Sequence, residues 1–317
     1  SPKADGAQKQ TLTLAQHLVP AIKKARLLGR ANQSQKIPLT IALTTRNTEE
    51  LDALLRRLYD PRDTLFGQYL TTEEYTANYA VSEEEYQEVL AFAKSKGLEV
   101  TNTTSNRLLL NLKGSVSTIE KAFGVHINTY QTANGRQFYA NDTNPVIPSS
   151  LQNKIAGIVG LDNYAVHRTH TVKRPSQSVG KVKAHGSGQG GGLTPSDIAA
   201  AYGLKGLTQN GAGQTLAVFE LDGYYPADIS TYLSNFNLPS VPLKNILVSG
   251  ADGTPGGSSD SVAQDIELQL AVASGATSVL VYEGPNSTTG VLDTYNRIAT
   301  DNLAKQISTS WGIDEGS

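Results

Sequence analysis

The side chains best suited to chemistry stand on one expected helix in the last third of the chain. Val262, Ile266 and Leu270 recur at i, i+4 and i+8, which is the apolar stripe of an amphipathic helix. Asp265 stands off that stripe, so its carboxylate faces either water or a cleft. Ser261 lies one turn earlier on the same face. A serine hydroxyl cannot act as a general base near physiological pH, so Asp265 is the stronger candidate for chemistry.

This helix belongs to a run of alternating elements. We expect strands at residues 215–221, 245–249, 277–282 and 306–311, and helices at residues 194–202, 226–236, 262–273 and 289–303. Such alternation predicts an α/β doubly wound parallel sheet, whose sites form at the carboxyl ends of the strands. Asp222, Glu283 and Trp311 lie there. Asp222 could be a functional residue or could only form the turn before Gly223. Trp311 could be a wall of the substrate cleft or an aromatic packed in the core.

The first half of the chain has a different pattern. We expect strands at residues 37–43, 98–103, 107–112, 125–131 and 137–140, and helices at residues 12–28, 47–58, 82–94 and 115–123. Asn47 and Ser82 are the expected helix caps, and Asn134-Gly135 is a strong hairpin turn. Mixed helices and antiparallel strands predict an α+β ferredoxin-like domain over residues 37–163.

Residues 166–192 separate the two patterns. They lack apolar periodicity and contain five glycines within residues 186–192, which indicates a flexible linker. No strand precedes these glycines, so a dinucleotide-binding loop is excluded. His167, His170 and His185 leave open a plain linker, a metal site or a pH-sensitive processing hinge. We therefore divide the chain into residues 1–165, 166–192 and 193–317.

Composition narrows the class of protein. A net charge of -2 over 317 residues gives no reason to expect nucleic acid or an anionic membrane as partner. No apolar run approaches the roughly 20 residues that span a bilayer. Cysteine is absent, which excludes disulfides and thiol nucleophiles, and methionine is absent even at position 1. We expect a secreted or periplasmic protein that has lost a leader segment.

Several motifs carry a family resemblance. Residues 66–75, Phe-Gly-Gln-Tyr-Leu-Thr-Thr-Glu-Glu-Tyr, follow Asp60-Pro61 and resemble the signature of the pro-kumamolisin activation domain. Residues 121–126 and 138–140 are similar to later parts of that domain. Thr194-Pro195 with Ala200 to Tyr202, Asp265-Ile266-Glu267, and residues 308–312 (Ser-Thr-Ser-Trp-Gly) resemble the catalytic domain of the sedolisins, which are serine-carboxyl peptidases. The matches run in order from about residue 37 to residue 313.

The resemblance implies a subtilisin-like catalytic domain that cleaves protein or peptide substrates in acid. In the family, an Asp on a helix polarises a Glu four residues earlier, and this Glu activates the nucleophilic serine. Asp265 matches that Asp, and Ser310, Trp311 and Gly312 match the substrate-binding strand. The prodomain is expected to inhibit and chaperone the catalytic domain, with residues 166–192 threading the cleft before cleavage at low pH. Calcium is an implied cofactor.

Two departures from the family pattern stand out. Ser261 occupies the position of the family Glu. Asp260 and Glu267 lie about 140° and 160° around the helix from Asp265, so neither replaces that Glu cleanly, although Asp260 could if the helix begins late. No Gly-Thr-Ser motif of the nucleophile occurs in residues 1–317. The nucleophile, the oxyanion-stabilising Asp and the calcium site are therefore expected downstream, with no metal ligand in this chain. The missing catalytic segment is an expected partner, possibly as a separate chain.

Three functions are compatible with these observations. The first is the precursor of a secreted, acid-acting sedolisin-type endopeptidase. The second is a catalytically inactive homologue that acts as a binding protein because Ser261 replaces the base. The third is an unrelated two-domain α/β binding protein. We favour the first.

Overall fold

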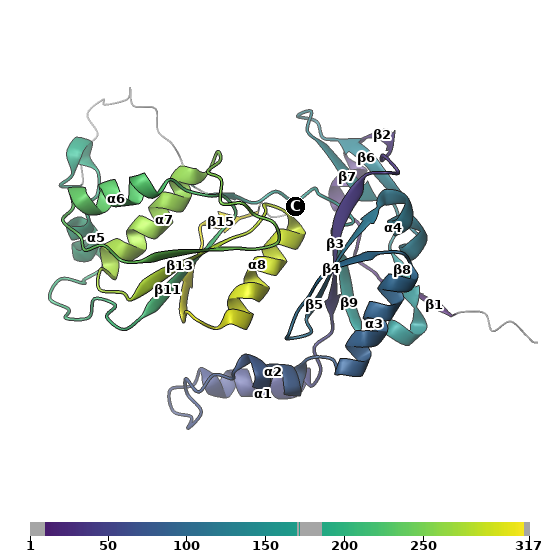
Figure 1. The fold of residues 1–317 in the computed structure, drawn as a ribbon, viewed down its shortest axis with the longest axis horizontal. Helices are drawn as coiled ribbons and strands as arrows, with labels where there is room; N and C mark the ends of the chain where they lie inside the picture. Colours follow the sequence, from purple (N-terminus) through teal and green to yellow (C-terminus); the bar gives the residue numbers. More distant parts are fainter. Residues whose placement is uncertain (1–9, 170, 172–185, 314–317) are drawn as a thin grey trace, which may run out of the picture. The chain divides into compact units, whose positions relative to one another are not determined.

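A computed structural model describes residues 10–169, 171 and 186–313 of the chain (Figure 1). The chain divides into two units, with the boundary between Val166 and His167. Each unit has its own sheets and its own hydrophobic core.

The first unit is built on a four-stranded antiparallel sheet with strand order β4-β5-β3-β9. Its strands are β3 (Lys36–Leu43), β4 (Glu99–Thr103), β5 (Leu109–Ser115) and β9 (Ile155–Val159). The first three were predicted from sequence alternation and are confirmed. The strand β9 was not predicted, and it forms one edge of this sheet.

A second sheet of the first unit has the order β2-β6-β7, with β2 (Arg26–Arg30), β6 (Ile127–Gln131) and β7 (Gln137–Asn141). The predicted hairpin of β6 and β7 is confirmed. Gly135 has a φ of 88° at its turn, a backbone conformation that glycine adopts without the steric cost that a Cβ would add.

The helix predicted over residues 12–28 is wrong. This segment instead contains β1 (Thr11–Thr13), the 3-10 turn η1 (Pro20–Lys23) and the start of β2. The strand β1 pairs with β8 (Val146–Pro148), and β2 pairs with β6. Hydrogen bonds to strands more than 90 residues away therefore outweigh a modest local helical pattern.

Four helices complete the first unit: α1 (Thr48–Leu58), α2 (Thr72–Tyr79), α3 (Glu83–Ser95) and α4 (Val116–Phe123). Only α2 was not predicted. The helix α3 begins with a capping box, in which Ser82 and Glu85 satisfy each other's backbone N–H groups. Asn47 precedes α1 as expected, but its side chain makes no cap hydrogen bond and donates to the Asn78 carbonyl.

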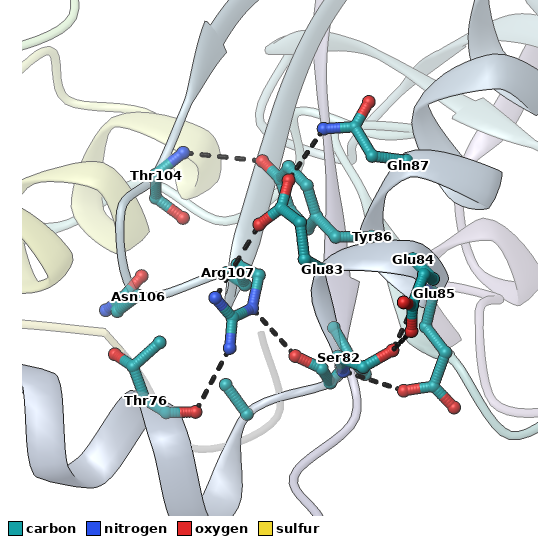
Figure 2. A network of polar contacts seen from close by, with 12 residues as sticks. Thr76, Ser82, Glu83, Glu84, Glu85, Tyr86, Gln87, Thr104, Asn106 and Arg107 are labelled. Atoms are coloured by element: carbon teal, nitrogen blue, oxygen red, sulfur yellow. Dashed lines mark hydrogen bonds and ion pairs between the residues drawn. The ribbon is translucent and has the colours of Figure 1, made fainter.

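Arg107 joins three segments of the first unit, as Figure 2 shows. Its guanidinium donates to the carbonyl oxygens of Val81 (2.7 Å) and Thr76 (3.3 Å) and lies 3.6 Å from the Glu83 carboxylate. Its φ of 54° is unusual for a residue with a side chain. The turn between β4 and β5 is thereby tied to the connection between α2 and α3. Tyr86 of α3 contributes a further hydrogen bond, from the Thr104 N–H to its hydroxyl.

The second unit contains the parallel sheet that the sequence predicts. Its order is β12-β13-β11-β14, with β11 (Thr215–Glu220), β12 (Leu243–Leu247), β13 (Ser278–Glu283) and β14 (Gln306–Ser308). All three pairings in this sheet are parallel. The carboxyl ends of β11 and β13 therefore lie at the same edge, because Glu220 is paired in register with Glu283.

Helices cover both faces of this sheet, α6 and α7 on one and α8 on the other (Figure 1). The helices of the unit are α5 (Pro195–Ala201), α6 (Pro226–Asn235), α7 (Ser259–Val272) and α8 (Thr288–Asp301). Leu216 and Val218 of β11 pack with Val262 and Ile266 of α7, whereas Ala217 faces the opposite core. The four predicted helices are confirmed, with α7 beginning almost one turn earlier than expected.

Two details of the second unit differ from expectation. The strand expected at residues 306–311 is interrupted: β14 stays in the sheet, while β15 (Trp311–Gly312) pairs antiparallel with β10 (Arg168–Thr169). Both described ends of the expected linker are ordered, since β10 lies at one end and the 3-10 turn η3 (Gln189–Gly191) at the other. His170 and His185 lie outside the described residues.

Candidate active site

The start of α7 is held by Asp222, which follows β11. Its Oδ1 atom accepts hydrogen bonds from the N–H groups of Gly223 (2.9 Å) and Gly256 (2.7 Å). Its Oδ2 atom accepts from the N–H of Ser258 (2.7 Å), the residue before α7. Asp222 thus shapes the loop that places the first turn of α7, and its carboxylate is committed to backbone donors.

Asp265 projects from α7 toward the substrate-binding strand suggested by the sequence. Its Oδ1 atom accepts a hydrogen bond of 2.6 Å from the Ser310 hydroxyl. Burial raises the pKa of Asp265, while the hydrogen bonds from Ser310 and from Glu220 act in the opposite direction. Asp265 and Ser310, which the sequence analysis named separately, are therefore in direct contact.

Glu220, the last residue of β11, is a buried carboxyl that the sequence reasoning missed. Its Oε2 atom accepts a 2.8 Å hydrogen bond from the indole Nε1 of Trp311. Burial raises its pKa to about 9, and the charges of Asp265 and Glu283 act in the same direction. Glu220 is therefore protonated at acidic and neutral pH.

Glu220 and Asp265 form a carboxyl pair. Each has one buried oxygen without a hydrogen-bond partner among the described residues, Oε1 of Glu220 and Oδ2 of Asp265. Burial and then the charge of Asp265 favour the neutral form of Glu220. Glu220 is therefore the member of the pair that stays protonated at neutral pH.

Ser261 is buried and contacts the segment that follows the first unit. Its Oγ atom lies 3.1 Å from the Oγ1 atom of Thr169 and 2.9 Å from that of Thr171. In extended backbone, residues at i and i+2 point to the same side. Position 261 thus presents a hydroxyl, and not a carboxylate, to this segment.

The segment around Thr169 is held on the second unit by backbone hydrogen bonds. Arg168 and Thr169 pair antiparallel with Gly312 and Trp311. One residue earlier, the His167 N–H donates to Asn286 Oδ1 (3.1 Å), and Asn286 Nδ2 donates to the His167 carbonyl (2.9 Å). Residues 167–169 therefore lie as an extended strand beside Trp311, Gly312 and Ser261.

Other acidic residues considered from the sequence lie outside this arrangement. Asp260 is exposed on the first turn of α7, about 140° around the helix from Asp265. Burial raises the pKa of Glu267 to about 7, and the charge of Asp228 on α6 adds to the shift. Glu283 ends β13 and is buried without a hydrogen-bond partner for either oxygen. Burial first, and then the charges of Asp222 and Asp252, raise its pKa to about 7.

Sequence patterns alone gave weak signals for the missed residues. Glu220 closes the run Thr-Leu-Ala-Val-Phe-Glu, where a single acid at the end of a buried strand was a usable signal. Asn286 and Thr169 gave no such signal, because their contacts join segments more than 90 residues apart.

The described residues contain no group of three or more histidine or acidic side chains placed to hold a metal ion. In the same part of the chain, no helix is long and apolar enough to cross a membrane.

The sequence of the first unit matches a known protein family. A sequence model of the family described as "Pro-kumamolisin, activation domain" matches residues 23–164. Residues 23–164 are therefore similar to a pro-kumamolisin activation domain. The match covers all four helices of the first unit and both of its larger sheets. The resemblance read from the sequence is thereby confirmed.

The similarity continues beyond the pro-kumamolisin domain. The chain is 28% identical over 301 residues to xanthomonalisin of Xanthomonas sp. (strain T-22), covering 87% of this chain and 35% of that protein. It is 29% identical over 301 residues to kumamolisin of Bacillus sp. (strain MN-32), covering 91% and 53%. Sedolisin of Pseudomonas sp. (strain 101) is 26% identical over 286 residues, covering 86% and 47%. These homologues are peptidases of the sedolisin family.

The chain spans between about a third and about a half of the length of these relatives. Among solved structures, Pseudomonas sedolisin, a serine-carboxyl proteinase complexed with pseudo-iodotyrostatin, matches with a TM-score of 0.34 and 22% identity. That match covers 37% of this chain and 34% of the sedolisin chain.

Proposed function

We propose that this protein is part of the precursor of a secreted, acid-acting serine-carboxyl endopeptidase. The observation that carries the proposal is the position of residues 167–169. They lie antiparallel to Trp311 and Gly312, beside the helix that bears Asp265. This is how an extended peptide would add to the edge of a substrate-binding strand.

The pro-kumamolisin domain supplies the inhibitory and chaperoning part of this proposal. Its sheet order β4-β5-β3-β9, with α3 between β3 and β4 and α4 between β5 and β9, supports a ferredoxin-like topology. The parallel sheet of the second unit is compatible with the beginning of a subtilisin-like domain. In the precursor, residues 167–169 occupy the place of a substrate until the chain is cut between residues 167 and 192.

In this mechanism, Asp265 is a positioning residue. The Ser310 hydroxyl and the protonated Glu220 fix its carboxylate and share its negative charge. A carboxylate base at position 261 would lie within one helical turn of Asp265 and accept a proton from a serine nucleophile. This chain has Ser261 there, so cleavage by the wild type requires another group to accept that proton. Because carboxylates stay partly ionised in acid, such a pair works at a pH at which histidine would be charged.

The rest of the site belongs to the proposal as well. The serine nucleophile and the oxyanion-stabilising acid are assigned to a further catalytic segment, joined to this chain or associated with it. Calcium is proposed on family grounds only, and we assign no ligand for it because the described residues do not form a suitable cluster.

A second function is favoured by one observation. Ser261 is buried and its hydroxyl contacts those of Thr169 and Thr171, so this segment is held beside α7 with no base at position 261. Such a protein would be a catalytically inactive homologue that binds extended peptides.

One experiment separates these functions. The protein is prepared with its further catalytic segment as wild type, Ser261→Glu, Ser261→Gln and Asp265→Asn, and intact mass is followed at pH about 4. The precursor proposal expects cleavage between residues 167 and 192 in the wild type, none in Asp265→Asn, and a rate at least about a hundredfold higher in Ser261→Glu than in Ser261→Gln.

The other outcomes are equally decisive. Cleavage in Ser261→Glu alone would establish the inactive homologue, in which only the base has been lost. If no variant is cleaved, or if no further segment with a serine nucleophile exists, the peptidase proposal is overturned.

A further inference from the structure

His17 lies in the N-terminal segment of the first unit, between β1 and η1, against the free edge of the main sheet. The strand β9 forms that edge, with β3 on its other side. The outward N–H of Ile158 in β9 donates a 3.0 Å hydrogen bond to the Nε2 atom of His17. The imidazole therefore satisfies a backbone donor that the sheet leaves unpaired.

The contact of Nδ1, the second ring nitrogen, determines the tautomer of the His17 imidazole. His17 Nδ1 lies 2.8 Å from the carbonyl oxygen of Ala15, which can only accept a hydrogen bond. Nδ1 must therefore carry the proton, while Nε2 must keep its lone pair for Ile158. Only the neutral imidazole protonated at Nδ1 satisfies both contacts.

The surroundings hold the ring close to β9. A Cβ at position 157 would lie 3.3 Å from His17 Nε2, so Gly157 permits the close approach. The His17 backbone is fixed as well, because its N–H donates to Asn144 Oδ1 (3.0 Å) and its carbonyl accepts from Asn141 Nδ2 (2.9 Å). His17 thus connects the N-terminal segment to two different parts of the domain.

We infer that His17 is an acid-sensitive latch that fastens residues 10–23 to the edge strand β9. A proton added to Nε2 places an N–H against the Ile158 N–H, so the hydrogen bond is lost and two donors face each other. Acid therefore loosens the N-terminal segment, including the β1–β8 pairing and the contact of η1 with the aromatic cluster around Tyr130 and Phe138. This inference concerns the stability of the pro-kumamolisin domain and holds whether or not the chain is a peptidase precursor.

No charged side chain is among the contacts of the ring in the described part of the chain. The charged groups on the packed segments have partners of their own: Lys154 before β9 pairs with Glu88, and Asp142 pairs with His126 at 3.4 Å. Asp162 after β9 accepts from the Tyr164 N–H, and burial raises its pKa. Asp162 therefore favours the folded state in acid, opposite to His17, and the test must separate the two.

Hydrogen–deuterium exchange of the full chain makes this test. Protection factors, corrected for the intrinsic effect of pH, are compared at pH 7.5 and 4.5 for peptides covering residues 10–25 and 155–159. In the wild type, we expect protection of both peptides to fall about tenfold in acid. In His17→Gln, the side-chain oxygen accepts from Ile158 at either pH, so the acid effect disappears.

His126→Gln is the matched control and should keep the response of the wild type. A wild type without an acid effect at these peptides, or an equal effect in His17→Gln, would overturn the latch. Nitrogen-15 NMR of the histidine rings gives a readout that needs no variant. The wild type should show the Nδ1–H tautomer of His17 at pH 7.5, and an Nε2–H tautomer would contradict the geometry.

Discussion

The carboxyl groups around Asp265 differ in how they carry protons. Glu220 keeps its proton up to a pH of about 9, whereas Glu283, which is paired with it across β11 and β13, has a pKa of about 7. Both shifts arise first from burial. The carboxyl end of this sheet therefore gains negative charge in steps as the pH rises, and acid stabilises it.

Glu283→Gln should flatten the pH dependence of stability in the second unit. The pKa of Glu283 is raised in the folded chain, so its stabilising contribution is complete below pH about 4.5 and is lost as the pH rises through about 7. Between pH 5 and 8, the free energy of unfolding of the wild type should fall by about 2 kcal/mol more than that of Glu283→Gln.

Urea unfolding followed by tryptophan fluorescence measures this difference, because Trp311 is the only tryptophan in the sequence. The exposed Glu49 provides the control variant Glu49→Gln, which should follow the wild type. Equal slopes for wild type and Glu283→Gln would contradict the prediction.

A second prediction compares the stabilities of two variants of Glu220. Glu220→Gln keeps a neutral side chain that accepts from the Trp311 indole, so at pH 7 its stability should stay within about 0.5 kcal/mol of the wild type. Glu220→Ala leaves the indole N–H of the partly buried Trp311 without an acceptor and opens a cavity, which should cost about 3 kcal/mol. The same fluorescence measurement applies, and equal losses in both variants would show that Glu220 is charged.

Single residues also mark the limit of sequence reasoning. Asp265, Ser310 and Trp311 could be proposed as site residues because they stand in short motifs, one on the helix α7 and one at residues 308–312. Glu220 was missed although a single acid at the end of an apolar strand was a usable signal. The contacts of Ser261 with Thr169 and Thr171 could not be predicted, since they depend on the tertiary position of a segment about 90 residues earlier in the chain.

Elements of the two units differ in how they are stabilised. In the second unit, the strands and helices follow local periodicity, and the sequence predicted them well. In the first unit, the segment 12–28 and the strand β9 depend on distant partners, such as the pairing of Thr11 with Pro148. Their local patterns were misleading for this reason.

Arg107 supplies the prediction at the scale of elements. Arg107→Ala removes donors to the Val81 and Thr76 carbonyls and should lower the free energy of unfolding of the first unit by about 2 kcal/mol. Arg62→Ala is the control, because Arg62 has 89% of its side chain exposed and should contribute almost nothing. Calorimetric unfolding compares the two, and indistinguishable midpoints would rule out the network as a stabilising connection.

At the scale of the whole molecule, the attachment of residues 167–169 should control how fast a protease cuts the chain. Asn286→Ala removes both hydrogen bonds to the His167 backbone, so this segment should leave β15 more often. We expect an added protease to cut within residues 166–192 about tenfold faster than in the wild type, as followed by intact mass. The exposed Gln209 gives the control Gln209→Ala, and equal cutting rates in all three proteins would contradict the prediction.

The mode of attachment at Asn286 has an evolutionary consequence. Its amide bonds the N–H and the carbonyl of residue 167, and the pairing of residues 168 and 169 with 312 and 311 is also a backbone pairing. The exposed side chain at 168 can therefore drift without loss of docking, provided that the backbone stays extended. Relatives could acquire new cutting sites beside this segment one substitution at a time, while the residue at 286 stays under selection.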